Sequence, residues 1–528
     1  MVSAHMMSPQ KEEKVSRTAL VFLSAYALVS TIVGRAFTAL TPSPADGQLF
    51  AYMGQEWLRG RLPYVDIWDF KPPGILALIA LAFSHFPNTF KTLAFVEGIF
   101  IIGTIVTVYL IMRRCGAPFL AAVLATLAAA IACNLKAFNE HGTYTEIYLL
   151  WPATLSMYFF VRAGPRFQGK FIFLAGLFTG FATLFKQVGF SPLLAQGAFL
   201  AFVAVRRQLS PAAVFRSVLT NLAGVFAAWA PFAGYFASHH ALGAMVDACL
   251  VAPVMYRAGG GHSILFRLDI LASKLQPLAS LIIAAGVGIT LYFADIAKRS
   301  LNPPDAEEKT PDLQFFWPLA FLWLFGDLCG SLAGGRGFAH YFLALVPSLS
   351  VVVGFTYWEL VPRIPRYPNE IRLKMVMLVF IVGPLFFPQS LDVRDFLNLT
   401  VKHEAPPVRS WEKIAESINE TRAASDTLFA WDYLPGIYFA TGMRSPTKQL
   451  FGFRIFQSPT FHQKFGEEII QELDAEPPTF IVDATADSEI PAFRQRDSVY
   501  NRFRRLVDGG YLLVYRAEEL KLYKRAGS

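Results

Sequence analysis

Acidic and basic side chains gather in short stretches between long apolar runs, and the first stretch could do proton and phosphate chemistry. It reads "DGQLFAYMGQEWLRGRLPYVDIWDFKPPG", with Asp46 at its start and Asp69 and Lys71 near its end. Pro72 and Pro73 fix the backbone after Lys71, since proline has a locked φ and no N–H. An ammonium group on such a rigid mount suits a phosphate at the level of lipid headgroups. Asp46 could accept a proton from a hydroxyl.

Both residues also have plain structural interpretations. Aspartate is common as the N-cap of a helix, and "DGQLFAYMGQEWLRG" has apolar side chains at helical spacing, typical of a helix lying on a membrane surface. Lys71 could be a lysine whose stem runs along apolar surface while its charge stays in water. The structural and functional interpretations are compatible.

Further polar candidates lie between later apolar runs. Glu146, in "NEHGTYTEIY", begins a run where a carboxylate is energetically expensive and therefore suggests function. His141 lies five residues before it, a poor spacing for two metal ligands on one helical turn. Glu97 and Asp327 occur within apolar runs, so we expect them to face the interior of the bundle. The remaining candidates are Lys186, His262, Arg267, Arg336, His340 and Tyr341.

Composition shows what kind of protein must hold these residues. The 528 residues are 54% hydrophobic and 16% charged, against about 25% charged residues in ordinary soluble domains. The apolar runs are long and do not alternate, which predicts a helical membrane bundle and excludes a β-barrel. The net charge of +8 could indicate nucleic-acid binding. We favour a topological origin, because most basic residues lie in short loops between the runs.

About eleven apolar runs approach the roughly 20 residues that a spanning helix needs. The stretch 73–87 is shorter, and we expect an interfacial or re-entrant helix there. The predicted spans lie near residues 18–37, 92–112, 117–134, 146–162, 171–186, 188–205, 217–238, 275–296, 314–333, 339–361 and 374–391.

Charge distribution predicts the orientation of the bundle. If the N-terminus is cytoplasmic and 73–87 does not cross, the basic clusters all fall on the inner side, as the positive-inside rule requires. Residues 1–16 are then a disordered cytoplasmic segment, with no cleaved signal peptide. The segments predicted to face outward are 38–91, 135–145, 238–274, 334–338 and 392–528.

The chain changes character near residue 400. "SWEKIAESINETRAAS" has helical periodicity with Ser410 as a candidate N-cap, and "DTLFAWD" and "TFIVDAT" are typical of buried strands. "SVYNRFRRLVDGG" predicts a helix and "YLLVYRAEELKLYKR" a terminal hairpin. We therefore expect a small α/β domain over 400–528, outside the membrane, beside a transmembrane domain over 17–391.

Four cysteines are present: Cys115, Cys133, Cys249 and Cys329. Their spacing fits neither a CxxC motif nor a metal site. Cys133 and Cys249 could share the outer side and form a disulfide, but buried thiols are the favoured interpretation.

The first stretch, with its Lys-Pro-Pro ending, resembles the first outer loop of lipid-linked-sugar glycosyltransferases with the GT-C fold. The resemblance is to the protein O-mannosyltransferase and lipid A aminoarabinose transferase superfamily. "TYTEIY" resembles a second acidic site of these enzymes, and "HYFLALVP" a His-Tyr…Pro motif of a late helix. The resemblance covers most of residues 18–390 and includes the C-terminal domain.

The resemblance implies an activity and roles. A sugar would move from a polyprenyl-phosphate donor to a lipid, glycan or protein acceptor on the outer face, with inversion. Asp46 would be the base, with Glu146 as the second catalytic carboxylate. Lys71 would bind the carrier phosphate. From the residues themselves, we expect Lys186 and Arg336 to bind the same phosphate as further fixed cations. The expected substrate-binding residues are His141, His262, His340, Tyr341 and Asp69. The implied location is the inner membrane of a bacterium.

Two departures from the family pattern concern a metal ion. Many relatives have two adjacent acids at the loop start, whereas Gly47 follows Asp46 here. The aminoarabinose transferase has an acid just before Lys-Pro-Pro, where this chain has Phe70. The sequence therefore predicts no metal ligand and no certain cofactor, with a divalent metal as the open alternative.

Two other classes of function compete. A transporter or flippase for polyprenyl-linked sugars or lipids explains a large bundle with charges at the membrane edge. It leaves the Lys-Pro-Pro loop and the outer domain unexplained, and no inverted repeat is visible. A non-catalytic scaffold of envelope biosynthesis is the third alternative.

Overall fold

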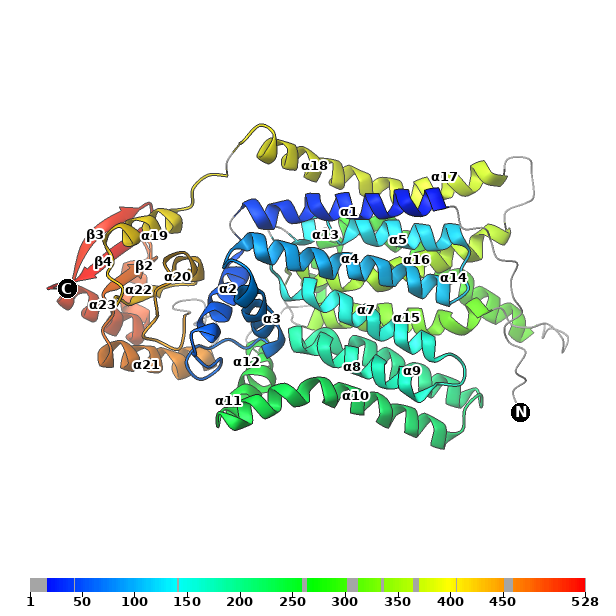
Figure 1. The fold of residues 1–528 in the computed structure, drawn as a ribbon, viewed down its shortest axis with the longest axis horizontal. Coiled ribbons are helices and arrows are strands. Elements are labelled where there is room, and N and C mark those ends of the chain that lie inside the picture. The colour runs from blue at the N-terminus through cyan, green and yellow to red at the C-terminus, as the bar shows by residue number, and fades with distance from the viewer. Residues whose placement is uncertain are drawn as a thin grey trace.

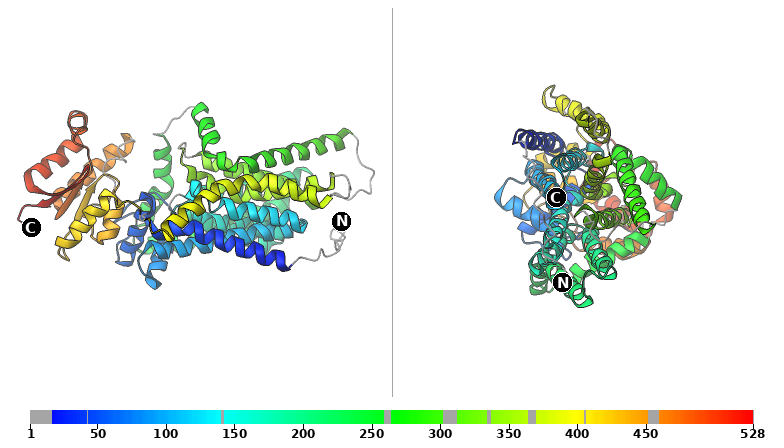
Figure 2. Two further views of the ribbon diagram at one scale, coloured as in Figure 1. Left: turned by 90° about the horizontal axis from the view of Figure 1, so that it is seen from above. Right: turned by 90° about the vertical axis from the view of Figure 1, so that its right-hand side faces the viewer.

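A long helical bundle carries a small α/β domain at one end (Figure 1). This computed structural model describes residues 17–41, 43–139, 142–258, 264–301, 312–333, 337–363, 370–404, 406–450 and 459–527. The bundle end beside the C-terminal domain, where α2 (Ala45–Leu58) and α3 (Pro73–His85) also lie, is called the domain end below. Figure 2 shows the same arrangement from above and along the bundle.

Every predicted span is helical. The last one extends beyond the predicted residue 391, because α17 and α18 follow each other through a short 3-10 turn. The long helices are α1 (Arg17–Leu40), α4 (Phe90–Arg114), α5 (Phe119–Ala132), α7 (Thr145–Ala163), α8 (Gly169–Phe185), α9 (Ser191–Val205), α10 (Pro211–Ser238), α14 (Ala279–Leu301), α15 (Asp312–Ala333), α16 (Leu345–Leu360), α17 (Glu370–Val382) and α18 (Phe386–Thr400).

Eight helical segments of the described chain are long and apolar enough to cross a membrane. The chain is therefore a multi-pass membrane protein. The spans are Arg17–Leu40, Phe90–Arg114, Gln187–Val205, Pro211–Ser238, Gln276–Lys298, Phe315–Ala333, Ala339–Arg363 and Arg372–Thr400. Among the other predicted runs, α5 and α8 are apolar but shorter than these spans.

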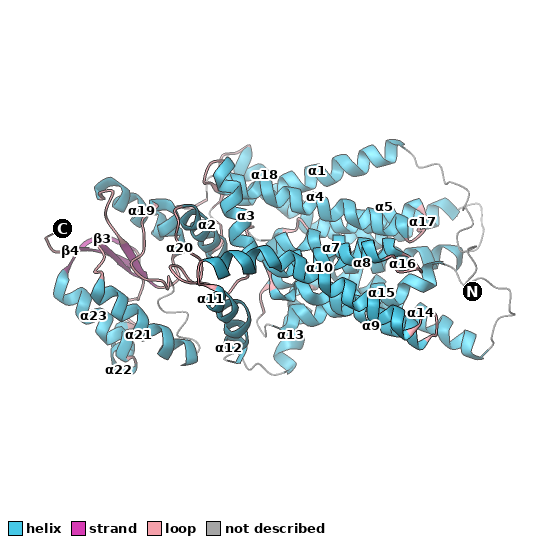
Figure 3. Ribbon diagram, turned by 60° about the horizontal axis from the view of Figure 1, so that its bottom comes forward, coloured by secondary structure: helices cyan, strands magenta, loops and turns pink. Residues whose placement is uncertain are grey.

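Shorter helical elements complete the bundle and its ends. The α-helices are α6 (Lys136–Asn139), α11 (Leu242–Val246), α12 (Ala252–Ala258) and α13 (Ile264–Lys274). The 3-10 and π elements are η1 (Gln187–Phe190), η2 (Asp247–Val251), η3 (Gln276–Leu278), η4 (Ala339–Ala344), η5 (Val361–Arg363) and η6 (Gly383–Leu385). The short helices α11 and α12 lie at the domain end beside α2 and α3 (Figure 3).

Prolines mark the start of α2 and α3, the two helices at the domain end that are called the platform helices below. Pro44 is the N-cap of α2, so Asp46 lies in the first turn of the helix, and its N-cap interpretation was wrong. Pro73 is the first residue of α3 because its missing N–H would be unbonded there anyway. A Cβ at Gly74 would lie 2.6 Å from the carbonyl oxygen of Leu184, so only glycine lets α3 pack this closely on the end of α8.

The C-terminal domain has a four-stranded sheet of order β1-β2-β4-β3. Strands β1 (Leu428–Trp431) and β2 (Phe480–Asp483) are parallel, and β3 (Tyr511–Ala517) and β4 (Leu520–Arg525) form an antiparallel hairpin. Trp431 stacks on Phe503 with ring centroids 4.2 Å apart in its core. The helices are α19 (Ser410–Thr421), α20 (Pro435–Thr441), α21 (Pro459–Ala475), α22 (Ile490–Arg496) and α23 (Ser498–Gly510).

One detail of this domain differs from the sequence prediction. The N-cap of α19 is Arg409, and Glu412 accepts a hydrogen bond from the Arg409 backbone N–H. Ser410 is instead the first residue of the helix, and its hydroxyl donates to Glu518 at 2.6 Å. The sequence pattern located the helix correctly but its cap one residue late.

Buried polar groups and thiols lie where the bundle can satisfy or shield them. Glu97 is fully buried, and Asp327 accepts hydrogen bonds from Ser191 and Ser348. Both carboxylates therefore face the interior, as expected from the cost of exposing them to lipid.

None of the four cysteines forms a disulfide, and Cys329 is exposed rather than buried.

Candidate active site

Seven of the predicted site residues come together at the domain end of the bundle. They are supplied by α2, the loop before α3, the start of α7, the end of α8 and η4. Figures 1 and 3 show this region between the bundle and the C-terminal domain. The seven residues are Asp46, Asp69, Lys71, Glu146, Lys186, His340 and Tyr341.

Asp46 is a half-buried carboxylate surrounded by positive groups. Its Oδ1 accepts a 2.7 Å hydrogen bond from the hydroxyl of Tyr433 in the C-terminal domain. Enclosure by the protein alone would raise the pKa of Asp46, but Lys71, the Tyr433 hydrogen bond, His340 and Lys186 together hold this pKa below its ordinary value. The side chain is therefore ionised at neutral pH, as a proton acceptor requires.

Lys71 is held by its backbone from two directions. The hydroxyl of Tyr64 donates to the Lys71 carbonyl at 2.8 Å, and Gln187 donates to the carbonyl of Phe70 at 3.1 Å. The ammonium group lies 4.3 Å from the ring centroid of Phe70 and 5.4 Å from that of Phe50. The ammonium group of Lys71 therefore has few positions to choose from. It is restricted by the two prolines, the backbone hydrogen bonds and the two aromatic rings.

Asp69 is the second carboxylate of the first stretch, and it is buried beside Lys71 and Asp46. Only 1% of it is exposed, and its Oδ2 has no hydrogen-bond partner among the described residues. Burial raises the pKa of Asp69; Asp46 adds to this rise and Lys71 opposes it. Asp69 and Asp46 therefore have opposite tendencies, one toward the neutral form and one toward the charged form.

Glu146 and Lys186 form a buried ion pair on the bundle side of the site. Thr145 Oγ1 lies 3.0 Å from the other carboxylate oxygen of Glu146. The ammonium group of Lys186 also lies 3.8 Å from the ring centroid of Tyr341. The pair therefore fixes a cation between a carboxylate and an aromatic face, close enough to Asp46 to influence its ionisation.

His340 joins the late helix to the second predicted outer loop. Its ring stacks on Tyr144, with centroids 3.9 Å apart and planes 10° apart. The sequence singled out His340 but not Tyr144, whose only signal was its place in "TYTEIY". This stack connects η4 with the start of α7 and so places Tyr341 beside Lys186.

A buried ion pair supports the second predicted outer loop from within the bundle. Arg35 contacts Glu97 at 2.5 Å, and Glu97 accepts a 2.6 Å hydrogen bond from the backbone N–H of Thr143. Gly142 has a φ of +80°, and a Cβ there would lie 1.9 Å from Thr38 Oγ1. The sequence identified Glu97 as interior but gave no indication that its partner was this loop.

Gly47, where many enzymes of the resembled superfamily have a second acid, leaves no room for a side chain. A Cβ at Gly47 would lie only 2.6 Å from the Cβ of Thr143. A second acid at this position would therefore displace the loop that leads to Glu146. No group of three or more His, Cys, Asp or Glu residues that could hold a metal ion occurs in the described part of the chain.

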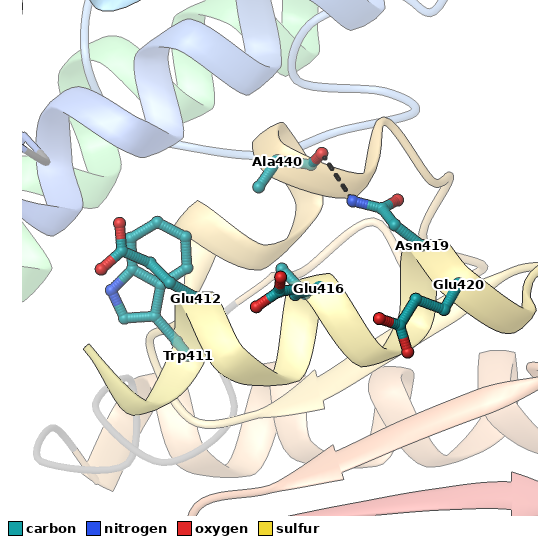
Figure 4. A pocket seen from close by; sticks show the side chains of 7 residues that line it. Trp411, Glu412, Glu416, Asn419, Glu420 and Ala440 are labelled. Carbon is teal, nitrogen blue, oxygen red and sulfur yellow. Dashed lines mark hydrogen bonds between the residues drawn. The ribbon is translucent and has the colours of Figure 1, made fainter. Parts of the chain in front are cut away.

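Three predicted site residues lie outside the described residues: His141, His262 and Arg336. The sequence missed Tyr433, which follows a strand in the C-terminal domain and carries no local motif. A separate pocket of about 470 Å³ lies on the C-terminal domain along α19, and Figure 4 shows its acidic side chains Glu412, Glu416 and Glu420. None of the candidate site residues lines it.

Comparison with known proteins identifies the fold. No family model matches the chain, and no curated protein matches it. Among solved structures, ArnT from Cupriavidus metallidurans in the apo state, a GT-C lipid A aminoarabinose transferase, matches with a TM-score of 0.54 and 13% identity. The match covers 96% of this chain and 97% of that chain. The chain therefore has the GT-C architecture, a polytopic helical bundle with a small C-terminal α/β domain, and the fold expected from the resemblance is confirmed.

Two weaker structural matches are with larger glycosyltransferases. The Saccharomyces cerevisiae protein O-mannosyltransferase Pmt1-Pmt2 complex bound to the sugar donor matches with a TM-score of 0.34 and 16% identity, over 43% of this chain and 34% of that chain. The arabinosyltransferase EmbB from Mycobacterium smegmatis matches with a TM-score of 0.41 and 11% identity, over 90% of this chain and 43% of that chain.

Proposed function

We propose that the protein is an integral membrane glycosyltransferase that moves a sugar from a polyprenyl-phosphate donor to a lipid, glycan or protein acceptor. The observation that carries this proposal is the ionised Asp46 carboxylate beside the ammonium groups of Lys71 and Lys186, at one end of a GT-C bundle. In this proposal the domain end faces outward from the inner membrane of a bacterium, with the N-terminus in the cytoplasm.

Lys71 and Lys186 form the donor side of the proposed site. A polyprenyl phosphate becomes more negative on its bridging oxygen as the sugar leaves, and fixed cations stabilise that developing charge. Lys71 meets the phosphate at the membrane edge, and Lys186 acts from the bundle side, where Glu146 holds it. Arg336 is proposed as a third cation on the same phosphate.

Asp46 forms the acceptor side. It takes the proton of the acceptor hydroxyl while the oxygen of that hydroxyl bonds to the anomeric carbon. The bond from the anomeric carbon to the phosphate oxygen breaks, and its electron pair leaves with the polyprenyl phosphate. A single displacement of this kind inverts the anomeric centre and needs no redox partner.

The aromatic and remaining polar residues complete the proposed site. Tyr341 and His340 line it beside Lys186, and Asp69, His141 and His262 are proposed to bind the sugar or the acceptor. Glu146 acts on the reaction through Lys186, because its carboxylate contacts that ammonium group and the hydroxyl of Thr145.

The test uses the full chain in nanodiscs with a panel of polyprenyl-phosphate sugars and membrane extract as acceptor source. Release of polyprenyl phosphate is followed for the wild type, Asp46→Asn and Lys71→Ala. We expect release with one sugar and a loss of about 10²–10⁴-fold in Asp46→Asn, the usual contribution of a general base. Lys91→Ala is the matched lysine control, since Lys91 is exposed at the start of α4.

Two outcomes contradict the proposal. Full turnover in Asp46→Asn removes the base assignment. Absence of release with every sugar, together with binding of a lipid phosphate, favours the transporter or flippase instead.

A further inference from the structure

Tyr433 reaches the proposed site from a separate part of the fold. It lies 387 residues after Asp46 in the chain, yet its hydroxyl donates to Asp46 Oδ1 at 2.7 Å. It follows β1, at the carboxyl end of the parallel pair β1 and β2. Side chains at that edge of a parallel pair commonly form ligand sites in α/β domains.

The backbone before Tyr433 is in a strained conformation. Asp432 has a φ of +134°, which residues with a side chain rarely adopt. This residue turns the chain out of β1, and Pro435 then begins α20. Strain of this kind persists where the surrounding structure holds the residue, and it clusters at functional sites.

Contacts between the C-terminal domain and the platform helices maintain the approach of Tyr433. The Tyr52 hydroxyl in α2 donates to the carbonyl of Met443 at 3.1 Å and accepts from the N–H of Ser445 at 3.3 Å. A Cβ at Gly436 would lie 2.5 Å from Gln48 Oε1, so α20 lies directly against α2. The interface therefore keeps Tyr433 at a fixed position relative to Asp46.

We infer that Tyr433 is a positioning residue of the glycosyl transfer, which orients the Asp46 carboxylate and keeps it ionised. This inference rests on the proposed function. The hydrogen bond occupies Oδ1, so Oδ2 takes the proton of the acceptor hydroxyl. The C-terminal domain thus contributes directly to the catalytic centre.

The charges around Asp46 determine the sign of the expected effect. Lys71, Lys186 and His340 favour its charged form, and Asp69 is the neighbouring carboxylate. The Tyr433 hydroxyl donates a hydrogen bond that stabilises the charged carboxylate of Asp46 more than the neutral acid. Removing the hydroxyl therefore raises the pKa of Asp46, and the acid limb of the pH–rate profile moves to higher pH.

The experiment is a pH profile of kcat/KM for Tyr433→Phe in nanodiscs, with the donor sugar found for the wild type. A hydrogen bond to a charged group corresponds to an upward shift of about one pH unit in the acid limb. We also expect kcat to fall about tenfold or more while the donor KM changes less than twofold, because the variant leaves the phosphate cations in place.

Two Tyr→Phe controls separate this effect from loosening of the domain. Tyr52→Phe weakens docking of the C-terminal domain without touching Asp46. Tyr511→Phe removes a hydrogen bond to the Pro478 carbonyl inside the C-terminal domain. We expect Tyr511→Phe to keep the acid limb of the wild type. Tyr52→Phe should move the limb less than Tyr433→Phe does, because the Tyr433 hydroxyl is still present.

An unmoved acid limb in Tyr433→Phe overturns the inference, even if the rate falls. If this variant does not fold, 3-fluorotyrosine at position 433 supplies a stronger donor of nearly the same shape and moves the limb to lower pH. An unmoved limb there also overturns it. Absence of transfer in the wild type counts instead against the proposed function, so the two failures are distinguishable.

Discussion

The hydroxyl of Tyr64 donates a 2.8 Å hydrogen bond to the carbonyl oxygen of Lys71. The residue proposed to bind the donor phosphate is therefore fixed through its main chain, while its ammonium group lies beside the rings of Phe50 and Phe70. The first loop therefore supplies the Lys71 charge and also fixes its position.

Tyr64→Phe tests this fixation. We expect the donor KM to rise about fivefold with little change in kcat, because a neutral hydrogen bond is worth about 1 kcal/mol and the cation itself remains. Steady-state kinetics with the donor sugar measures both values. Tyr158→Phe, whose hydroxyl accepts from Arg162 in α7, is the control, and an equal rise there would argue against a local effect.

The Glu146–Lys186 pair predicts a double-mutant cycle. Each single variant, Glu146→Gln and Lys186→Met, leaves one member of a buried pair without its partner, so we expect each to lose about 3–5 kcal/mol of stability. The double variant should recover much of that stability in thermal unfolding but no activity, because the cation is gone. Recovery of transfer in the double variant would show that Lys186 does not act on the donor.

Gly142→Ala tests the support of the loop before α7. Both its φ of +80° and the close approach of Thr38 oppose a side chain, so we expect a marked fall in the midpoint of thermal unfolding. Gly164→Ala is the matched control, since its φ is +64° but no atom lies within 3.8 Å of the added Cβ. Equal losses in the two variants would mean that backbone strain alone explains the effect.

Asp69→Asn predicts a pH-dependent gain in stability. The pKa of Asp69 is raised in the folded chain, so its stabilising contribution is fully present below its unfolded pKa and is lost as pH rises through the folded pKa. Asparagine resembles the neutral acid at every pH. We therefore expect the variant to unfold at a higher temperature than the wild type near pH 7.5, and at a similar temperature near pH 4. A gain that is largest at acid pH would contradict the assignment.

Chelation addresses the divalent metal that the sequence left open. Asp46 already lies near Lys71 and Lys186, and Glu146 pairs with Lys186, so a further cation would meet like charge at both carboxylates. We expect EDTA to leave the rate of polyprenyl phosphate release unchanged. Loss of activity that Mg²⁺ or Mn²⁺ restores would require a metal site that includes residues beyond these two acids.

The length of the apolar runs and the positions of the prolines predicted most of the fold. A run of about 20 apolar residues becomes a helix in any membrane protein because lipid offers the backbone no other hydrogen-bond partner. Pro72 and Pro73 likewise predicted where the short helix α3 begins, since their effect is local. The caps were less predictable, and both Asp46 and Ser410 lie within the first turn of their helices.

The site was predictable only where its residues share a local motif. Asp46 and Lys71 belong to one loop. Glu146 lies at the start of an apolar run, where a charged residue is energetically expensive and therefore suggests function. Tyr433 and Tyr144 meet the site through tertiary packing, which neither periodicity nor spacing encodes. A tyrosine in a mostly soluble segment gives no sign that its partner lies hundreds of residues away.

The distance along the chain between Asp46 and Tyr433 has a consequence for biogenesis. The carboxylate is synthesised with the first loop, whereas its hydrogen-bond partner follows 387 residues later, after the helices of the bundle. A ribosome-bound chain with only the early helices inserted holds the proposed base without the group that orients it. The centre described here is therefore assembled late, once the C-terminal domain has been synthesised and has folded against α2.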